Sequence, residues 1–268
     1  MSNVAKKENN LPSAELMEEM FESAGEGAVF EANELQIPNI RIAQSTSPQL
    51  KKSDAKYIPE LKQGDFFNTV TGQVWDGEKG IVVIPCHSQT SYPEFIPESQ
   101  GGGFVGLREV TDPDLINARR EGAKEFLPNG NEIIKTDEYY CLVLGDNGMY
   151  EPAIIGMKTT ALAVSRVWKT RIALKKVPDS KGTMRTPALF AVMWRLTVVE
   201  KSKTVDGAMR TWFSPQVEEE GLVSDPVLFR EAKAFRESVA KGEVKAAPEG
   251  DTVTVTDEAE VDVGDIPF

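Results

Sequence analysis

The chain has 268 residues and two cysteines, and its formal net charge at pH 7 is −12. This length is enough to bury a hydrophobic core in one large domain or two small ones, and so few cysteines argue against a disulfide scaffold. The sequence has no apolar run of transmembrane length and no apolar stretch of a secretory signal near its N-terminus. We therefore expect a cytoplasmic protein without a membrane partner.

The negative charge lies at the two ends of the sequence. Residues 1–34 carry eight acidic and two basic side chains, and residues 249–268 carry seven acidic side chains and no basic one. The body of the chain is therefore nearly neutral, and a neutral sum can hide a basic face on one side of a domain. The acidic composition does not exclude a nucleic-acid partner.

Helical spacing and capping residues predict four helices, and the segment 25–34 has the composition of a linker. Asp112-Pro113 and Asp225-Pro226 are typical helix starts, and Gly242 is a typical helix end. The predicted helices cover residues 13–23, 112–124, 159–174 and 224–241.

Strand-like segments separated by turn residues predict three hairpins from residue 37 onward. They join residues 64–75 to 80–86 across Asp76-Gly77, residues 139–144 to 150–157 across Asp146-Asn147-Gly148, and residues 188–199 to 204–213 across the polar segment 200–203. Short antiparallel hairpins with inserted helices favour a β-rich α+β fold, and an OB-like, partly closed antiparallel barrel fits the pattern. The acidic residues after 246 lack a large apolar face, which predicts a disordered tail.

The residue inventory argues against catalysis. His87 is the only histidine, so no Ser-His or Cys-His system can be assembled by spacing, and we interpret it as a polar residue at a strand end. Cys86, His87 and Cys141 give at most three soft metal ligands. We therefore expect no catalytic residue, no metal and no cofactor.

Two local motifs resemble enzyme signatures but lack the required context. Residues 101–106 match the spacing GxGxxG, but the preceding segment contains two prolines and no helix follows directly. Asp179-Ser180-Lys181 has the local form of a metal-dependent nuclease motif without an acidic partner on a preceding strand. A flexible loop and a solvated turn are the favoured interpretations, and a nuclease is the weakest hypothesis.

The segment 158–186 is strongly basic, with eight Lys and Arg residues against one acidic residue, Asp179. Binding of single-stranded nucleic acid needs cations along the phosphates and aromatic faces on which bases stack. The alternative for Trp168 is burial in the core beside Val164 and Ile172. The predicted DNA-binding side chains of this segment are Lys158, Arg166, Trp168, Lys169, Arg171, Lys175, Lys176 and Arg185.

Strand alternation adds five candidates for the same interface. Arg210 and Trp212 share one face of their strand, and Arg195 is expected to neighbour Arg210 across the hairpin. Phe67 and Trp75 share a face with polar residues, a pattern that favours stacking on bases. In contrast, Trp194 belongs to an apolar row and is predicted to lie in the core.

The sequence ends in Asp265-Ile266-Pro267-Phe268, a small apolar group that follows an acidic segment. A pocket with an apolar floor and an Arg or Lys rim would capture such an end through its α-carboxylate. The tail resembles that of bacterial single-stranded DNA-binding proteins, which also end in acids followed by Ile-Pro-Phe. The resemblance implies that Asp265, Ile266, Pro267 and Phe268 recruit replication, recombination and repair proteins. A tail that ends by chance in apolar residues is the alternative.

The body also carries short motifs that resemble proteins encoded in the replication regions of tailed bacteriophages. These proteins are commonly regarded as binding single-stranded DNA, and the resemblance spans roughly residues 37–170. It implies a location in the host bacterial cytoplasm. The motifs are Ile37-Pro38-Asn39-Ile40, Ser47-Pro48-Gln49, Gly64-Asp65-Phe66-Phe67-Asn68, Glu151-Pro152-Ala153 and Ser165-Arg166-Val167-Trp168.

Taken together, the sequence predicts a non-enzymatic protein that coats single-stranded DNA and recruits partners through its tail. We expect an acidic N-terminal segment with a short helix and linker in residues 1–34, an OB-like DNA-binding domain in 35–245 and a docking tail in 246–268. A homo-oligomer is compatible with this function. The alternative is a phage structural or host-takeover protein that docks a host factor through its tail and does not bind DNA.

Overall fold

The computed structural model describes residues 12–23, 36–122, 124–145, 148–205 and 208–246. Contacts divide the chain into a first unit of residues 1–35 and a second unit of residues 36–268. The first unit contains helix α1 (Ala14–Glu22), which confirms the helix predicted there. Ser13 caps it by accepting a hydrogen bond from the backbone N–H of Leu16. None of its residues is buried.

The second unit is rich in strands. Its strands are β1 (Gln36–Ile37), β2 (Asn39–Ile42), β3 (Phe66–Asn68), β4 (Val74–Trp75), β5 (Ile81–Phe95), β6 (Phe104–Arg108), β7 (Arg119–Glu121), β8 (Lys124–Phe126), β9 (Glu132–Ile133), β10 (Thr136–Leu144), β11 (Tyr150–Lys158), β12 (Val177–Pro178), β13 (Met184–Arg185), β14 (Val192–Val205), β15 (Ala208–Leu222) and β16 (Lys245–Ala246). Its helices are α2 (Pro113–Ile116), α3 (Ala161–Leu174) and α4 (Pro226–Ala240), with short 3₁₀ turns η1 (Pro48–Leu50), η2 (Glu98–Gln100) and η4 (Leu189–Ala191).

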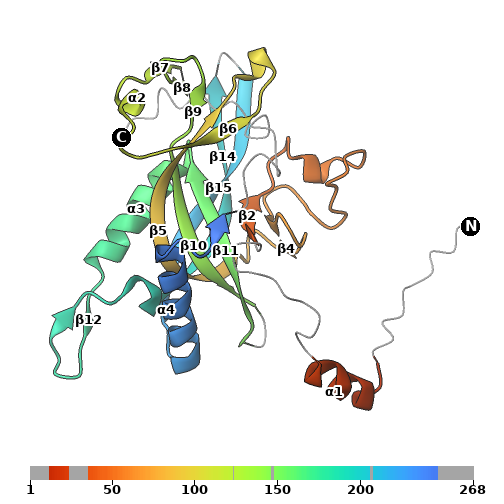
Figure 1. Ribbon diagram of the computed structural model, residues 1–268, viewed down its shortest axis with the longest axis vertical. Coiled ribbons are helices and arrows are strands. Elements are labelled where there is room, and N and C mark those ends of the chain that lie inside the picture. The colour runs from red at the N-terminus through yellow and green to blue at the C-terminus, as the bar shows by residue number, and fades with distance from the viewer. Residues whose placement is uncertain (1–11, 24–35, 123, 146–147, 206–207, 247–268) are drawn as a thin grey trace, which may run out of the picture. The chain divides into compact units, whose positions relative to one another are not determined.

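Twelve of the described strands form one large mixed sheet (Figure 1). Its main order is β4-β3-β2-β11-β10-β5-β9-β8-β7, and β14 and β6 also pair with β5. The pairing of β11 with β2 is parallel, whereas β10 pairs antiparallel with both β11 and β5. The predicted strand-rich α+β class is confirmed. The sheet is not closed into a barrel, because β4 and β7 end its order and do not pair with each other among the described residues.

The alternation of side chains along β10 explains why helices cover both faces of this sheet. Tyr139, Cys141 and Val143 belong to a core cluster that includes Trp168 of α3. The intervening Tyr140 and Leu142 belong to clusters packed against residues of α4. Helices α3 and α4 therefore lie on opposite faces of the sheet, and both confirm helices predicted from the sequence.

The β10–β11 hairpin is confirmed in register from Thr136 opposite Lys158 to Leu144 opposite Tyr150, and residues 146–147 of its turn lie outside the described residues. The β14–β15 hairpin is longer than predicted. Residues 200–203, which we expected to form its turn, lie inside β14, and the pairing continues to Val205 opposite Ala208. The predicted turn position is therefore wrong by several residues.

The first predicted hairpin is also wrong in its pairing. The chain reverses between β3 and β4, where the Asn68 side chain accepts hydrogen bonds from the backbone N–H groups of Val70 and Thr71 at 2.9 and 3.0 Å. Asp76 does form a turn, because its carboxylate accepts from the backbone N–H groups of Glu78 and Lys79. The strand that follows, β5, pairs with β10 instead of with the segment before the turn.

The helix predicted for residues 112–124 begins where expected, but it ends at Ile116, well before the predicted end. The Asp112 carboxylate caps α2 by accepting from the backbone N–H of Asp114 at 2.9 Å. After Ile116 the chain forms the short antiparallel hairpin β7–β8, in which Arg119 lies opposite Phe126. The capping signal fixes only the first turn of a helix, and this one has four residues.

The buried carboxylate of Glu94, near the C-terminal end of β5, links this strand to β6 and to the loop between β8 and β9. The Glu94 side chain accepts hydrogen bonds from the Arg108 guanidinium at 2.5 Å and from the Asn129 and Asn131 amides at 2.8 and 2.6 Å. Only 4 % of this side chain is exposed. The bond from Arg108 lowers the pKa of Glu94 to about 2, and the two amides act in the same direction.

We expect the Glu94 carboxylate to make the stability of the protein depend on acid. A carboxyl whose pKa is lowered in the folded state contributes stability above its unfolded pKa of about 4.5, and that contribution disappears as the pH falls through about 2. Urea unfolding should lose on the order of 2–3 kcal/mol more between pH 5 and pH 2 in the wild type than in Glu94→Gln. Equal losses in the two proteins would show that this network does not stabilise the fold.

Candidate nucleic-acid interface

The basic segment 158–186 begins at the end of β11, continues through α3 and closes with the small hairpin β12–β13. Ser165 and Trp168 are the two fully buried residues of α3, so this side of the helix faces the sheet. Arg166 and Arg171 are exposed, and Lys158 at the end of β11 is half-buried. Only some of the basic residues in this segment therefore have exposed side chains.

Trp168 lies in the core and not on a surface that bases could reach. Its side chain has no exposed area, and its indole ring stacks on Tyr139 with ring centroids 4.2 Å apart. Trp194 contacts it edge to face from β14. The alternative of burial beside Val164 and Ile172 is thus correct, and the prediction that Trp168 stacks on bases is wrong because its apolar area closes the core under α3.

Lys169 links α3 to the sheet through an ion pair with the buried Asp137 carboxylate, although 41 % of the Lys169 side chain is itself exposed. Its ammonium lies 2.7 Å from the Asp137 carboxylate, which also accepts hydrogen bonds from the Ser165 and Thr90 hydroxyls at 2.6 and 2.8 Å. Burial raises the pKa of the Asp137 carboxyl, but the bonds from Lys169, Ser165 and Thr90 outweigh it, and the pKa lies below its ordinary value. The charge of Lys169 is therefore already compensated by Asp137.

Arg171 of α3 and Lys175, the residue that follows this helix, contact β15. The Arg171 guanidinium donates to the Val217 carbonyl at 2.5 Å, and the Lys175 ammonium pairs with the Glu219 carboxylate. The close approach of the C-terminal half of α3 to β15 produces both contacts. These side chains position the helix and are not the strongest candidates for phosphate contact.

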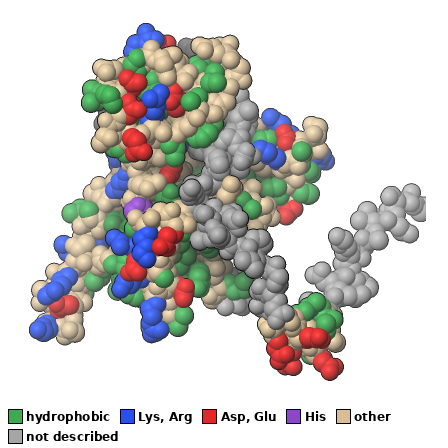
Figure 2. Space-filling view, in the orientation of Figure 1, with side chains coloured by type: hydrophobic (Ala, Val, Ile, Leu, Met, Phe, Trp, Pro, Cys, Tyr) green, Lys and Arg blue, Asp and Glu red, His purple; other side chains and the backbone are tan. Residues whose placement is uncertain are grey.

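Three exposed cations of the segment lie on or directly before the β12–β13 hairpin. It projects from the sheet in Figure 1, and basic side chains gather at this projection in Figure 2. Lys176, Lys181 and Arg185 are exposed, and Arg185 pairs with Asp179 at 2.9 Å. The Asp179 carboxylate also accepts from the backbone N–H groups of Lys181 and Thr183, which confirms a solvated turn at this position. The hairpin is thus a basic loop with one structural acid.

The candidates on β14 and β15 are not adjacent as predicted. Arg195 lies opposite Glu218, and its guanidinium forms a two-point ion pair with Glu220 at 2.8 Å that lowers the pKa of the Glu220 carboxyl. Arg210 lies opposite Lys203 near the other end of the hairpin. The predicted proximity of Arg195 and Arg210 is wrong because the turn lies farther along the chain.

The remaining aromatic candidates differ in burial. Phe67 is 2 % exposed and belongs to a core cluster, so its predicted position on a stacking face is wrong. Trp75 is half-buried against the main core, and Trp212 is half-buried on β15. Trp194 lies in the core as predicted. Trp75 and Trp212 are the predicted aromatic contacts that retain exposed area.

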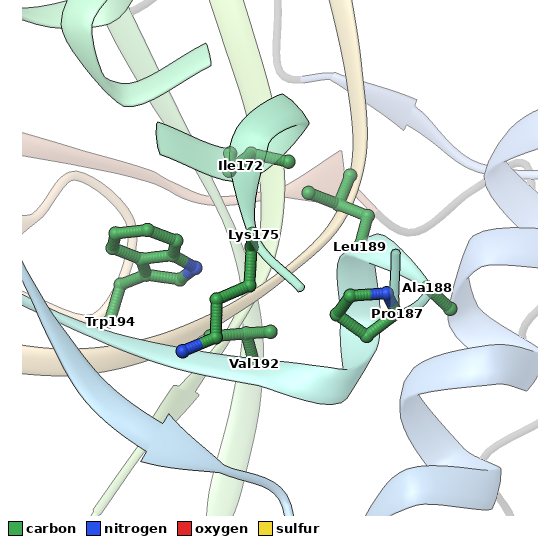
Figure 3. A pocket seen from close by; sticks show the side chains of 7 residues that line it. All are labelled: Ile172, Lys175, Pro187, Ala188, Leu189, Val192 and Trp194. Carbon is green, nitrogen blue, oxygen red and sulfur yellow. The ribbon is translucent and has the colours of Figure 1, made fainter. Parts of the chain in front are cut away.

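A small cavity lies under the C-terminal end of α3, with Trp194 on one side of it (Figure 3). Its volume is about 10 Å³, about the space that a single water molecule needs. It is therefore too small to hold a nucleobase. Its lining residues are Ile172, Lys175, Pro187, Ala188, Leu189, Val192 and Trp194.

A much larger hollow of about 510 Å³ lies between β5, η4 and α4. His87 contributes to it, and Figure 2 shows the histidine (purple) at the surface with basic side chains (blue) close by. Burial, and to a smaller extent the Arg236 guanidinium, lower the pKa of His87 below its ordinary value. The lining residues are Cys86, His87, Ser88, Leu189, Phe190, Lys233, Arg236 and Glu237.

Sequence reasoning missed this hollow. His87 lies in the interior of β5, opposite Tyr140, and not at a strand end. Lys233 and Arg236 are three residues apart on α4, which places them on one side of the helix. That spacing is visible in the sequence, but the packing of α4 beside η4 is not.

The structure offers no conventional metal or thiol chemistry among the residues it describes. They contain no cluster of three His, Cys, Asp or Glu side chains suited to a metal ion. Both cysteines are buried thiols, and burial raises the pKa of Cys86 to about 12. None of the described helices is long and apolar enough to cross a membrane.

Comparison with known proteins identifies one family. The family model described as Pam3 phage gp34-like protein matches residues 6–245, which include the whole sheet, α1, α3 and α4. Searches of curated proteins and of solved structures found no match. Since the matched region covers most of the sequence, the chain belongs to the Pam3 phage gp34-like protein family.

Proposed function

We propose that this protein binds single-stranded DNA during phage replication, recombination or repair in the host cytoplasm. It acts by binding and not by catalysis, and its C-terminal residues Asp265, Ile266, Pro267 and Phe268 recruit partner proteins. The name of the family supports a phage origin. The proposal does not depend on an OB-like barrel.

The observation that carries this proposal is the group of exposed cations on α3 and the β12–β13 hairpin. Arg166, Lys176, Lys181 and Arg185 are all exposed within twenty residues of sequence, and Asp179 is the only acidic residue of the segment. Cations on a projecting loop can follow the phosphates of a flexible strand without a rigid groove.

Half-buried aromatic residues complement these cations in the proposal. Trp75 and Trp212 keep part of their surface exposed, and each base stacked on a tryptophan ring is worth roughly 1–3 kcal/mol. Lys158, Arg195 and Arg210 are secondary candidates for phosphate contact. Trp168 and Phe67 are excluded from this role by their burial.

The test is a fluorescence titration with labelled oligo(dT) and with duplex DNA of the same length, each at two salt concentrations. We expect tighter binding to oligo(dT), and an affinity that falls steeply with salt as counterions are released from phosphates. Equal affinity for duplex DNA would contradict single-strand selectivity. No binding at low salt would favour the alternative, a phage structural or host-takeover protein that docks a host factor through its tail.

A further inference from the structure

The hollow between β5, η4 and α4 has more basic groups than acids to compensate them. Lys233 and Arg236 line it from α4, and His87 (purple in Figure 2) lines it from β5. Glu237 is the one carboxylate of the lining, and its oxygen lies 4.0 Å from the Lys233 ammonium. Among the described residues, the Arg236 guanidinium has no partner in a hydrogen bond or an ion pair. The hollow therefore presents an uncompensated guanidinium.

Arg236 and His87 are neighbours in this hollow, although both are basic. Burial lowers the pKa of the His87 imidazole, and the charge of the nearby guanidinium lowers it further. The imidazole contacts the ring of Tyr140 on β10 edge to face, with ring centroids 5.9 Å apart. An anion placed between the guanidinium and the imidazole would be attracted by the first and would accept a hydrogen bond from the second.

Apolar side chains of η4 form another wall of the hollow. Leu189 and Phe190 are half-buried, and the Phe190 ring packs on Phe229 of α4 with ring centroids 5.2 Å apart. The volume of about 510 Å³ lies within the usual range of small-molecule sites, roughly 300–1,000 Å³. A cationic wall beside an aromatic wall suits a ligand that joins a phosphate to a flat ring. We propose that the hollow binds the phosphate monoester of a nucleotide, with the base against Phe190.

A terminal phosphate fits these groups better than a phosphodiester inside a strand. A phosphate monoester carries a charge of about −1.5 to −2 at pH 7 and three acceptor oxygens, whereas a phosphodiester carries a single charge. A guanidinium such as that of Arg236 donates to two oxygens at once, and Lys233 adds a point charge. Ser88 brings a hydroxyl to the same lining. The monoester occurs in a free nucleotide and at the phosphorylated end of a DNA strand, and the experiment has an arm for each.

This hollow is separate from the cations that carry the proposed DNA interface. Helix α3 packs on one face of the sheet and α4 on the other. Binding of a free nucleotide therefore does not depend on the proposal that the protein coats single-stranded DNA. Only the case of a strand end rests on that proposed function, to which it adds a preference for DNA with a terminal phosphate.

The only histidine of the chain provides a direct probe of the hollow. Thymidine 5′-monophosphate added to the full chain should shift the His87 imidazole signals in an NMR spectrum until the site is saturated. Thymidine lacks the phosphate and inorganic phosphate lacks the base. We therefore expect each of them to bind at least about tenfold more weakly than the nucleotide.

Competition with DNA strands identifies the source of the phosphate. Short oligo(dT) with a 5′-phosphate and the same strand with a 5′-hydroxyl are each added to the complex with thymidine 5′-monophosphate. Displacement by the phosphorylated strand alone would identify a strand end as a ligand, and displacement by neither strand would identify the free nucleotide. Equal displacement by both strands would contradict recognition of a terminal phosphate.

Substitutions in the lining test the two parts of the ligand separately. Arg236→Glu should weaken binding of the nucleotide at least about tenfold, while Arg230→Glu, an exposed change on the same helix, should not. Phe190→Leu should weaken binding of the nucleotide and leave binding of inorganic phosphate unchanged, because it removes only the aromatic ring. Since Arg236 itself affects His87, calorimetric affinities are compared, and thermal melts verify that the variants are folded.

Two results would overturn the proposal. The first is a His87 spectrum that does not change when thymidine 5′-monophosphate is added. The second is equal affinity of the wild type and Arg236→Glu for this nucleotide. The titration with labelled oligo(dT) keeps the two proposals apart, because a protein that binds oligo(dT) but not the nucleotide lacks this site and still binds single-stranded DNA.

Discussion

Lys169→Met is expected to lower the free energy of unfolding by about 3 kcal/mol. The substitution removes the ammonium that lies 2.7 Å from Asp137 and leaves a carboxylate with only 5 % of its side chain exposed. The hydroxyls of Ser165 and Thr90 remain as donors, but they carry no charge to balance it. Urea unfolding followed by tryptophan fluorescence measures the loss.

A control substitution on the same helix distinguishes the loss of this ion pair from the general effect of replacing a cation on α3. Arg166 is exposed three residues earlier, and Arg166→Met should change the free energy of unfolding by less than about 1 kcal/mol. Adding Asp137→Asn to Lys169→Met should recover part of the loss, because the uncompensated charge disappears. A double variant that is less stable than Lys169→Met would contradict this explanation.

Neutralising the exposed cations of α3 and the β12–β13 hairpin is expected to weaken binding of oligo(dT) on the order of 100- to 1000-fold at 50 mM salt. The variant replaces Arg166, Lys176, Lys181 and Arg185 with Gln. If each side chain neutralises one phosphate, the slope of log K against log salt becomes shallower by roughly 0.7 per residue. The titration described above, repeated at several salt concentrations, gives both quantities.

A matched variant tests whether the location of these charges matters or only their number. Lys51, Lys52, Lys62 and Lys79 are exposed elsewhere on the second unit, and replacing all four with Gln removes the same charge. We expect the salt slope of this variant to stay close to that of the wild type. Equal slopes in the two variants would place the DNA contact elsewhere or reduce it to net charge.

The parts of the fold that the sequence predicted correctly depend on local signals. Helix α4 has an Asp225 cap and a glycine end, and the β10–β11 hairpin joins two segments across a short turn. Pairings between distant segments were not predictable in the same way. The turn at Asp76 was correct, but the partner of β5 lies about fifty residues later, where Cys141 pairs with Pro85. Nothing local encodes that choice.

The candidate site could likewise be predicted from the sequence only in part. A count of Lys and Arg residues cannot distinguish an exposed cation from one that is paired with a distant acid. Lys169 is compensated by Asp137, and Lys175 by Glu219, across long separations in sequence. Trp168 shows the corresponding limit for aromatic residues, because its helical spacing fits a core position as well as a stacking position. Only the tertiary contacts decide between them.

The outer part of the β14–β15 hairpin has both of its edges open. Among the described residues, β14 pairs with β5 only from Trp194 to Leu196, and the Gln44 side chain exchanges two hydrogen bonds of 2.9 Å with the backbone of Phe213. Beyond that point two strands continue alone, and unpaired strand edges are sites where further strands add. Glu200, Lys201 and Lys203 lie along this stretch. Such charges oppose the addition of a strand from another molecule, so we expect this ribbon to resist edge-to-edge pairing between molecules.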